Sequence, residues 1–536
     1  MIRGVTALLF ALLLFAPQEK RELCAVSGTV VDSLTGAPLS KAQVVLEPAY
    51  GKESATTASN EKGRFMLVGV APGTYLLKGV RNGYLDTYYG ARRPRSQGVK
   101  LTLVAGDESK GLELKLLPYA VIGGVVRDSD GEPLAGARVA LIGIAWVEGV
   151  RVVNAVGQYA NTDDQGRYRI PYVKPGSYYV RAAPKVTNEW RVMVDHSPKD
   201  APPPEGLVAT WHPGSRELAG ARRLDVATGD RVTDADVTLL RSRMFRVRVR
   251  TASPEGFDFD VRMQERPHFS DALVGISRSE CKDGLCDFTG VPSGAWLISG
   301  MASPPNRTLA DMFTAKALRA SLAVDVVNAD IDGLRLVVET GGEIVGRVVV
   351  EGEEHPKIPL HVVFVDGTGE ETRAIVADES FTALLSPGKY AVRVSVKDLV
   401  VERVRSENVD VLEEGLRVRP GKVPLEVVLS HNAASLDGIA QDGDGKPVAG
   451  ATVVLVPESS RRSRADLLRD VHTDQHGRYE ITAVPPGEYK LFAWNDVEPG
   501  IWFDPEFMKG VEAKGQEVKL SAKGHESETL TVLDPM

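Results

Sequence analysis

The strongest constraint on the fold of this chain is a segment that recurs three times along it. Its copies are "NEKGRFMLVGVAPGTYLL" (60–77), "DDQGRYRIPYVKPGSYYV" (163–180) and "DQHGRYEITAVPPGEYKL" (474–491). Each copy has an acid or amide, a glycine turn, an alternating strand, a Pro-Gly turn and a strand that starts with tyrosine. Alternation with period two between turn signals is typical of short antiparallel strands. The segment therefore predicts a β-rich unit that the chain repeats.

Two weaker copies follow the same plan. In "KDGLCDFTGVPSGAWLI" Trp296 replaces the tyrosine, and "DESFTALLSPGKYAV" keeps it as Tyr390. A chain of 536 residues is too long for one hydrophobic core. The sequence predicts an all-β protein of five tandem Greek-key β-sandwich modules, prealbumin- or immunoglobulin-like, in an elongated arrangement. The predicted modules span 24–118, 119–243, 244–341, 342–432 and 433–536, and the second has a long insertion near 184–210.

A second repeated element begins with spaced acids and glycines that resemble a calcium loop. Its copies are "DGDGKPVAGATVVL" (442–455), "DSDGEPLAGARVAL" (128–141) and "DSLTGAPLSKAQVVL" (32–46). An EF-hand would need oxygen ligands where Lys446 and Val453 stand. The copies keep their proline and vary their acids, whereas a calcium site would keep its oxygens. The element therefore predicts a hairpin-like turn.

Together these elements resemble a known family. "SGTVVDSLTGAPLSKAQVVLEP" followed by "NEKGRFMLVGVAPGTYLLKG" is similar to the carboxypeptidase regulatory-like domain, a transthyretin-like sandwich that is widespread, often in tandem, in secreted bacterial proteins. The first, second and fifth predicted modules carry the resemblance, and the third and fourth share only its Pro-Gly-aromatic turns and closing strands. The resemblance implies a non-catalytic sandwich related in shape to starch-binding-like folds. It does not imply a peptidase.

The N-terminus predicts export. Arg3 precedes the apolar run "VTALLFALLLFA", which is too short to span a membrane, so residues 1–17 are expected to be a signal peptide. No later segment is apolar for long enough to form a membrane helix, and no membrane span is expected in the mature chain. A net charge of −8 argues against nucleic-acid binding. The predicted location is secreted, periplasmic or at the cell envelope.

Two cysteines suggest a disulfide. Cys281 and Cys286 flank "KDGL", whose Asp283-Gly284 pair is able to turn a hairpin and bring the two side chains together. An oxidising compartment would allow the bond, and free buried thiols are the alternative. A zinc site would need about four ligands, and the nearest histidine in sequence is His268. We expect no metal and no cofactor.

Catalytic motifs are weak in this sequence. His525 and Glu528 have the spacing of a zinc-peptidase pair, but they lie too close to the C-terminus for a catalytic domain to follow. His472 and Asp474 would share one face of a strand, although their place in the repeat favours a turn. The sequence also lacks a nucleophile elbow, a Walker loop and a dinucleotide fingerprint. We therefore predict that the protein is not an enzyme.

Aromatic residues are the candidate ligand-binding groups. Three modules place them in corresponding segments, and the long insertion adds one more. Such rings either stack on a sugar or peptide ligand, or belong to the module's own core or its junction with a neighbour. The candidate residues are Tyr88, Tyr89, Trp190, Trp211, Trp502 and Phe503.

The sequence thus predicts an exported, non-catalytic protein that binds or scaffolds at the cell envelope or outside the cell. Its partner is a carbohydrate or a protein. One alternative is a carbohydrate-binding protein that uses the loop aromatics, for which exposed rings are required. Another is an accessory partner of a separate peptidase or outer-membrane transporter.

Overall fold

The computed structural model consists almost entirely of strands and turns. It describes residues 23–49, 54–91, 98–147, 150–157, 159–185, 204–266, 279–303, 305, 317–351, 360–367, 370–396, 399–462 and 464–534. The longest described helix, α3 (Pro505–Val511), has only 7 residues. The predicted all-β class is therefore confirmed. None of the described helices is long and apolar enough to cross a membrane.

Ten sheets form in the described part of the chain, and they follow one another in five pairs. A cluster of buried apolar side chains fills the space within each pair. Buried and exposed residues alternate along strands such as β27 (Gly342–Val350), so one side of the sheet faces the core. We propose that each pair with its core is one module of the predicted kind. We refer to the modules as the first to the fifth.

The first module shows the topology in its simplest form. Its strands are β1 (Cys24–Asp32), β2 (Gln43–Pro48), β3 (Ala55–Ala58), β4 (Arg64–Val70), β5 (Gly73–Val80), β6 (Thr87–Tyr88), β7 (Lys100–Leu103) and β8 (Glu108–Leu116). In one sheet, β1 is antiparallel to β4 and parallel to β8. In the other sheet, β5 lies between β2 and the short strands β6 and β7.

The second module repeats this plan. Its elements are β9 (Ala120–Arg127), β10 (Arg138–Val147), β11 (Val150–Ala155), β12 (Ala160–Asn161), β13 (Arg167–Val173), β14 (Gly176–Ala183), β16 (Thr210–Trp211), η1 (Leu218–Gly220), β17 (Leu224–Val226), β18 (Arg231–Val232) and β19 (Val237–Thr238). Here β9 pairs with β13 on one side and with β18 and β19 on the other. The second sheet is built around β10 and β14.

The fifth module has the same plan and an added helical segment. Its elements are β36 (Ala434–Gln441), β37 (Thr452–Pro457), η3 (Ser459–Arg461), η4 (Ala465–Leu467), β38 (Arg469–His472), β39 (Arg478–Val484), β40 (Gly487–Trp494), η5 (Ile501–Phe503), α3, η6 (Glu512–Lys514), β41 (Gln516–Leu520) and β42 (His525–Thr531). The strand orders are β39-β36-β42 and β38-β37-β40-β41.

One sheet of the third module includes a short strand from the residues that precede the module. Its strands are β20 (Arg241–Ala252), β21 (Asp258–Glu265), β22 (Ser279–Lys282), β23 (Leu285–Pro292), β24 (Gly294–Ser303), β25 (Leu318–Val326) and β26 (Ile331–Val337). The short strand β15 (Glu205–Leu207) pairs with the start of β20. Because β20 runs without a break from Arg241 to Ala252, the predicted boundary between residues 243 and 244 falls inside this strand.

The fourth module has one sheet of five strands and one of four. Its remaining elements are β28 (His361–Val365), β29 (Glu371–Ile375), β30 (Ser380–Leu385), β31 (Gly388–Ser395), β32 (Val400–Ser406), β33 (Val409–Asp410), α2 (Val411–Glu414), β34 (Leu416–Val418) and β35 (Gly421–Ser430). The strand orders are β30-β27-β35-β32-β33 and β29-β28-β31-β34. Although its sequence matches the repeat weakly, the parallel pairing of β27 with β35 repeats that of β1 with β8.

Carboxylates hold the turn that resembles a calcium loop. Asp442 accepts hydrogen bonds from the backbone N–H groups of Asp444 at 3.0 Å and Lys446 at 2.9 Å. Asp128 accepts the corresponding bonds from Asp130 and Glu132. Because these side chains serve their own turn, as turn-forming aspartates do, the turn interpretation is confirmed.

One hydrogen bond recurs at the Pro-Gly turn of all five modules. The aromatic residue that follows this turn donates from its hydroxyl or indole N–H to the carbonyl four residues earlier. The bond therefore spans the point where the chain leaves one sheet and enters the other. The pairs are Tyr75 with Ala71 at 2.8 Å, Tyr178 with Lys174 at 2.7 Å, Trp296 with Pro292 at 3.0 Å, Tyr390 with Ser386 at 3.0 Å and Tyr489 with Pro485 at 2.7 Å.

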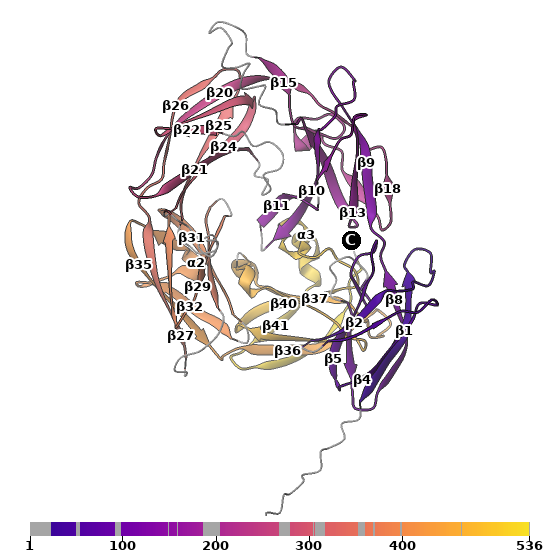
Figure 1. Ribbon diagram of the computed structural model, residues 1–536. Coiled ribbons are helices and arrows are strands. Elements are labelled where there is room, and N and C mark those ends of the chain that lie inside the picture. The colour runs from indigo at the N-terminus through magenta and orange to yellow at the C-terminus, as the bar shows by residue number, and fades with distance from the viewer. Residues whose placement is uncertain are drawn as a thin grey trace, which may run out of the picture.

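The modules form a closed ring, so the predicted elongated arrangement was wrong (Figure 1). The fifth module, drawn in yellow, lies beside the first, drawn in indigo. At this contact the backbone N–H of Thr102 donates to the side-chain oxygen of Gln475 at 3.0 Å, and the Gln475 amide donates back to Thr102 at 3.3 Å. The ends of the repeat array therefore meet.

Neighbouring modules of the ring contact each other through side chains at their junctions. Between the second and third modules, Arg181 forms an ion pair with Glu265. Between the third and fourth, the backbone N–H of Arg319 donates to the Ser386 hydroxyl at 2.6 Å, and this hydroxyl donates back to the Arg319 carbonyl at 2.7 Å. Because these partners lie far apart in sequence, the angle between neighbouring modules cannot be predicted from the short linkers that join them.

We predict that Tyr489→Phe loosens the fifth module without unfolding it. The ring of Tyr489 is 2% exposed, and burial raises its pKa to about 12, so its hydroxyl remains a donor at neutral pH. Loss of this hydrogen bond should cost about 1 kcal/mol. Hydrogen exchange of the β39 and β40 amides in the full chain measures the effect. Unchanged exchange would show that the bond contributes nothing to stability.

Candidate functional site

Trp211 lies in a second apolar layer rather than at the surface. Its side chain is 2% exposed and packs with Ala140 and Ile142 on the side of β10 that faces away from the main core. The guanidinium of Arg181 lies 5.1 Å from the Trp211 ring centroid, and the Tyr179 ring meets it edge-on at 6.4 Å. No ring face is left for a sugar, so this tryptophan is a core and junction residue.

Trp502 has the same kind of position in the fifth module. Its side chain is 7% exposed, because η5 and α3 cover the outer side of β37 and β40. Phe492 and Trp494 of β40 stack at 5.3 Å beneath this cover. Phe503 is half-buried, 6.5 Å from Trp502. Since η5 also packs near β10 of the second module, this segment belongs to a junction as well.

The remaining aromatic candidates are less enclosed. Tyr88 is half-buried, and its hydroxyl donates to Glu47 at 3.0 Å while the Lys78 ammonium lies 5.9 Å from its ring centroid. Tyr89 is half-buried and packs against the core of the first module. Trp190 lies outside the described residues. The candidates therefore do not converge on one surface, and the carbohydrate alternative based on Trp211 and Trp502 does not hold, because their rings are buried.

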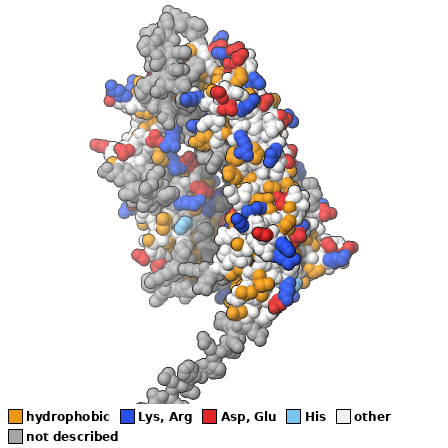
Figure 2. All heavy atoms as spheres, turned by 45° about the vertical axis from the view of Figure 1, so that its right-hand side comes forward, with side chains coloured by type: hydrophobic (Ala, Val, Ile, Leu, Met, Phe, Trp, Pro, Cys, Tyr) orange, Lys and Arg blue, Asp and Glu red, His pale blue; other side chains and the backbone are white. Residues whose placement is uncertain are grey.

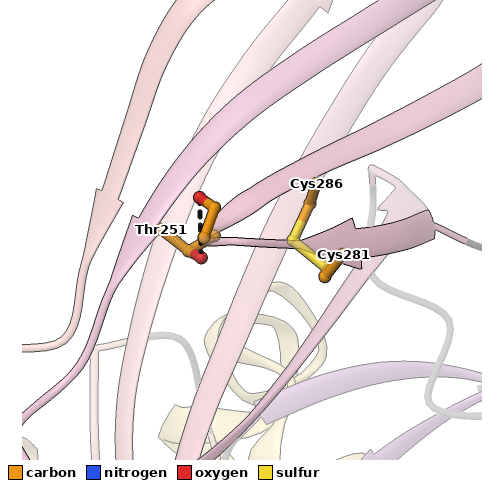
Figure 3. The surroundings of a disulfide bond; sticks show 4 residues. Thr251, Cys281 and Cys286 are labelled. Carbon is orange, nitrogen blue, oxygen red and sulfur yellow. Dashed lines mark hydrogen bonds between the residues drawn. A yellow bond between two sulfur atoms is a disulfide. The ribbon is translucent and has the colours of Figure 1, made fainter.

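Cys281 and Cys286 are joined by a disulfide in the third module (Figure 3). They are opposite each other in the pairing of β22 with β23, on either side of the turn at Asp283 and Gly284. Both turn residues have positive φ, 51° and 72°, as a tight hairpin turn requires. Thr251 of β20 donates from its backbone N–H and its hydroxyl to the Gly284 carbonyl, at 2.7 and 3.2 Å, and ties the turn to the sheet.

The candidate catalytic and metal groups serve local structure. His525 lies 3.3 Å from Asp437, whereas Glu528 is three residues further along the same strand and so points to the other face. Asp474 accepts the N–H groups of His476 and Arg478 at its own turn. Among the described residues, no three His, Cys, Asp or Glu side chains gather as metal ligands would.

A groove that the sequence analysis missed lies on the second module. Its volume is about 460 Å³, and it runs over the outward side of β9, β13 and β18. We refer to it as the arginine groove after Arg167, Arg169 and Arg231, which line it together with Gly123. The signal was present in the repeat itself, because "GRYR" in this module stands where the other strong copies read "GRFM" and "GRYE".

Comparison with known proteins supports the repeated architecture. The model of the carboxypeptidase regulatory-like domain matches residues 25–110, 121–199 and 435–496. The predicted resemblance is thereby confirmed for these three regions, which lie in the first, second and fifth modules. No curated protein matches the chain.

Several solved structures share local similarity with the chain at low identity. They are the Bacillus anthracis TIE protein (11% identity, 77% of this chain and 74% of that chain, TM-score 0.15), a streptococcal ancillary pilin (10%, 55% and 98%, 0.20) and the minor pilin GBS52 of Streptococcus agalactiae (12%, 40% and 94%, 0.22). At these TM-scores the likeness supports no conclusion about function.

We predict that Trp502→Ala destabilises the fifth module by about 3 to 5 kcal/mol, the usual cost of emptying a buried aromatic site. Hydrogen exchange of the β37 and β40 amides in the full chain reports this loss. Phe503→Ala is the matched control, and its smaller effect should follow from its partial exposure. Equal effects of the two variants would contradict the burial of Trp502.

We also predict that the fifth module weakens as the pH falls. Burial lowers the pKa of His472; Asp470 opposes this shift, and Lys100 of the first module adds to it. A lowered pKa means that the folded state resists protonation, so this stability is present above the unfolded value of about 6.5 and is lost below it. Local opening at β38, measured by hydrogen exchange, should increase between about pH 7.5 and about pH 5.5.

His472→Gln is the control for this pH effect. The variant has no group that titrates in this range at position 472, so its opening should depend less on pH than that of the unchanged chain. The same pH dependence in both proteins would assign the effect to other groups.

Proposed function

We propose that this protein is a non-catalytic scaffold, in which tandem carboxypeptidase regulatory-like domains are joined in a ring. It is exported, and it holds binding surfaces in fixed positions at the cell envelope or outside the cell. The observation that carries the proposal is the closure of the ring, since a chain that only needed to link its modules would not require contact between its ends. Its partner is a protein or a carbohydrate of that compartment.

The contact between Gln475 and Thr102 supports a defined ring, because the Gln475 side chain makes the same pair of hydrogen bonds to the backbone that a neighbouring strand would make. Gln475 presents its amide to the backbone of β7, and its side-chain oxygen and nitrogen bond the N–H and carbonyl of the same residue, Thr102. The backbone N–H of Gln475 also lies 3.4 Å from the Lys100 carbonyl. An edge strand otherwise leaves such groups open to pairing with another chain. The ring therefore satisfies part of this edge internally.

The chemistry of the candidate residues supports a non-catalytic role. The candidate histidines and acids are engaged in turns and strand contacts, and the aromatic candidates belong largely to cores and junctions. Export is supported by the expected signal peptide at residues 1–17, which lies outside the described part of the chain. The disulfide between Cys281 and Cys286 fits the same compartment, because such bonds persist where conditions are oxidising.

The closure of the ring is tested with spin labels at Val104→Cys and His476→Cys, which flank the contact on either side. A single short distance between the labels is expected. Gln475→Ala should broaden this distance distribution, because it removes two hydrogen bonds that contribute about 1 kcal/mol each. Asp164→Ala changes the same turn position in the second module, where the side chain is exposed, and should leave the distribution narrow. Long distances in the otherwise unchanged chain would overturn the ring and the scaffold built on it.

A further inference from the structure

The arginine groove concentrates positive charge on a protein whose net charge is −8. Arg167, Arg169 and Arg231 are exposed, and none of them forms an ion pair with another residue that the structure describes. Of the acids near the groove, Asp230 accepts the N–H of Ala227 at 2.7 Å and Asp236 accepts that of Val125 at 2.8 Å, while Asp234 is exposed beside the groove. The groove therefore offers three guanidinium groups to an anionic ligand.

The strand register places these side chains on one surface. Arg167 is opposite Val125 and Arg169 is opposite Gly123 in the pairing of β13 with β9, while Arg231 is beside Val121 on the other edge of β9. Tyr168, between the two arginines of β13, points into the core. Cationic side chains thus flank both sides of β9, and at Gly123 no side chain fills the floor between them.

Comparison with the other strong modules shows that this surface is individual. Arg167 recurs as Arg64 and Arg478 and belongs to the shared turn. In contrast, Arg169 and Gly123 have changed: the register places Met66 and Ser27 there in the first module, and Glu480 and Asp437 in the fifth. The fold of the module does not require a particular residue at these two positions, because three modules with the same fold have three different pairs of residues there. Among these three modules, the arginine groove is therefore a property of the second.

An exposed aromatic residue stands at the end of the groove. Tyr172 is 57% exposed and has a φ of 57°, a left-handed conformation that is costly for a bulky residue. At the corresponding position the first module has Gly69, with a φ of 75°. The Tyr172 ring meets Tyr119 edge-on at 5.4 Å, and Tyr119 precedes Val121 by two residues and so shares its side of β9. A tyrosine is thus kept at the surface where glycine would be less strained.

The way β9 is paired limits the kind of ligand. β13 occupies one edge of β9, and β18, β19 and the Asp236 carboxylate take up the other, so a peptide is unable to add to β9 as a strand. Recognition has to come from outward side chains, which here are guanidiniums beside tyrosine rings. Guanidiniums pair with carboxylates, and aromatic faces stack on sugar rings. From Tyr119 to Val125 this surface extends about 20 Å along the strand.

We propose that the arginine groove binds a polysaccharide whose sugars carry carboxylates. Arg169 and Arg231 pair with carboxylates on either side of β9, Arg167 adds a third positive charge, and Tyr172 stacks against a sugar ring at one end. The proposal deepens the proposed scaffold role by naming a ligand class and a site. Figure 2 shows Lys and Arg side chains interspersed with Asp and Glu over the visible face, and the net charge of the chain is −8, so the three arginines would provide local rather than global complementarity.

The test measures binding of hexagalacturonate to the full mature chain by calorimetry. Arg169→Gln and Arg231→Gln should each weaken binding about tenfold, because each removes one charge-assisted pair. Arg223→Gln, an exposed arginine of the same module that already pairs with Asp225, is the matched control and should bind normally. Tyr172→Gly should weaken binding without harming the fold, since glycine relieves the left-handed conformation.

Two further ligands separate the alternatives. Neutral maltohexaose should bind far more weakly than hexagalacturonate, and equal binding would overturn the role of the arginines. A decaglutamate peptide that binds equally well, with the same loss in Arg169→Gln, would overturn the sugar and assign the groove to acidic peptides. Absence of hexagalacturonate binding, or equal binding by Arg169→Gln, would overturn the site while the spin-label distances still report the ring independently.

Discussion

The hydrogen bond from the aromatic residue to the carbonyl four residues earlier is the one constraint that all five modules share at the crossing between their sheets. A β-sandwich requires the chain to leave one sheet and enter the other at a fixed point, and this bond fixes it. Tyr75, Tyr178, Tyr390 and Tyr489 use a hydroxyl, whereas Trp296 uses its indole N–H over the same separation. The donor chemistry therefore varies while the geometry is kept. Modules whose sequences have drifted can still be recognised by this bond.

Much of the fold could be predicted because its signals are local. Turns that bond to their own backbone, as at Asp442, and strands with period two need only a few neighbouring residues. The closed ring could not be predicted, because it depends on pairs such as Arg319 with Ser386 and Thr102 with Gln475 that no periodicity connects. The burial of Trp502 was hidden for a similar reason. It results from a short helical segment that lies on a sheet face which already belongs to a finished module.

The candidate site could not be predicted from the repeated residues. Residues that recur in the three strong copies, such as the turn glycine and the tyrosine of the repeated segment, serve the shape of the module. The groove arises where the copies differ, at Gly123, Arg169 and Tyr172. These positions are not shared between the copies, so the repeat does not mark them. The strand register was needed to show that they meet on one face, because Gly123 and Arg169 belong to strands that are separated by the whole of β10, β11 and β12.

Under the proposed function, the ring determines which faces of the modules are open to a partner. In Figure 1 the first sheets of the modules, with β1, β9, β27 and β36, lie on the outside, and the second sheets lie toward the inside. The added segments around Trp211 and Trp502 pack on second sheets, and η5 reaches β10 across the ring. The inner faces are thus used for contacts within the chain. Outward faces such as that of β9 and β13 lie on the outside of the ring, where the proposed scaffold would present them to a partner.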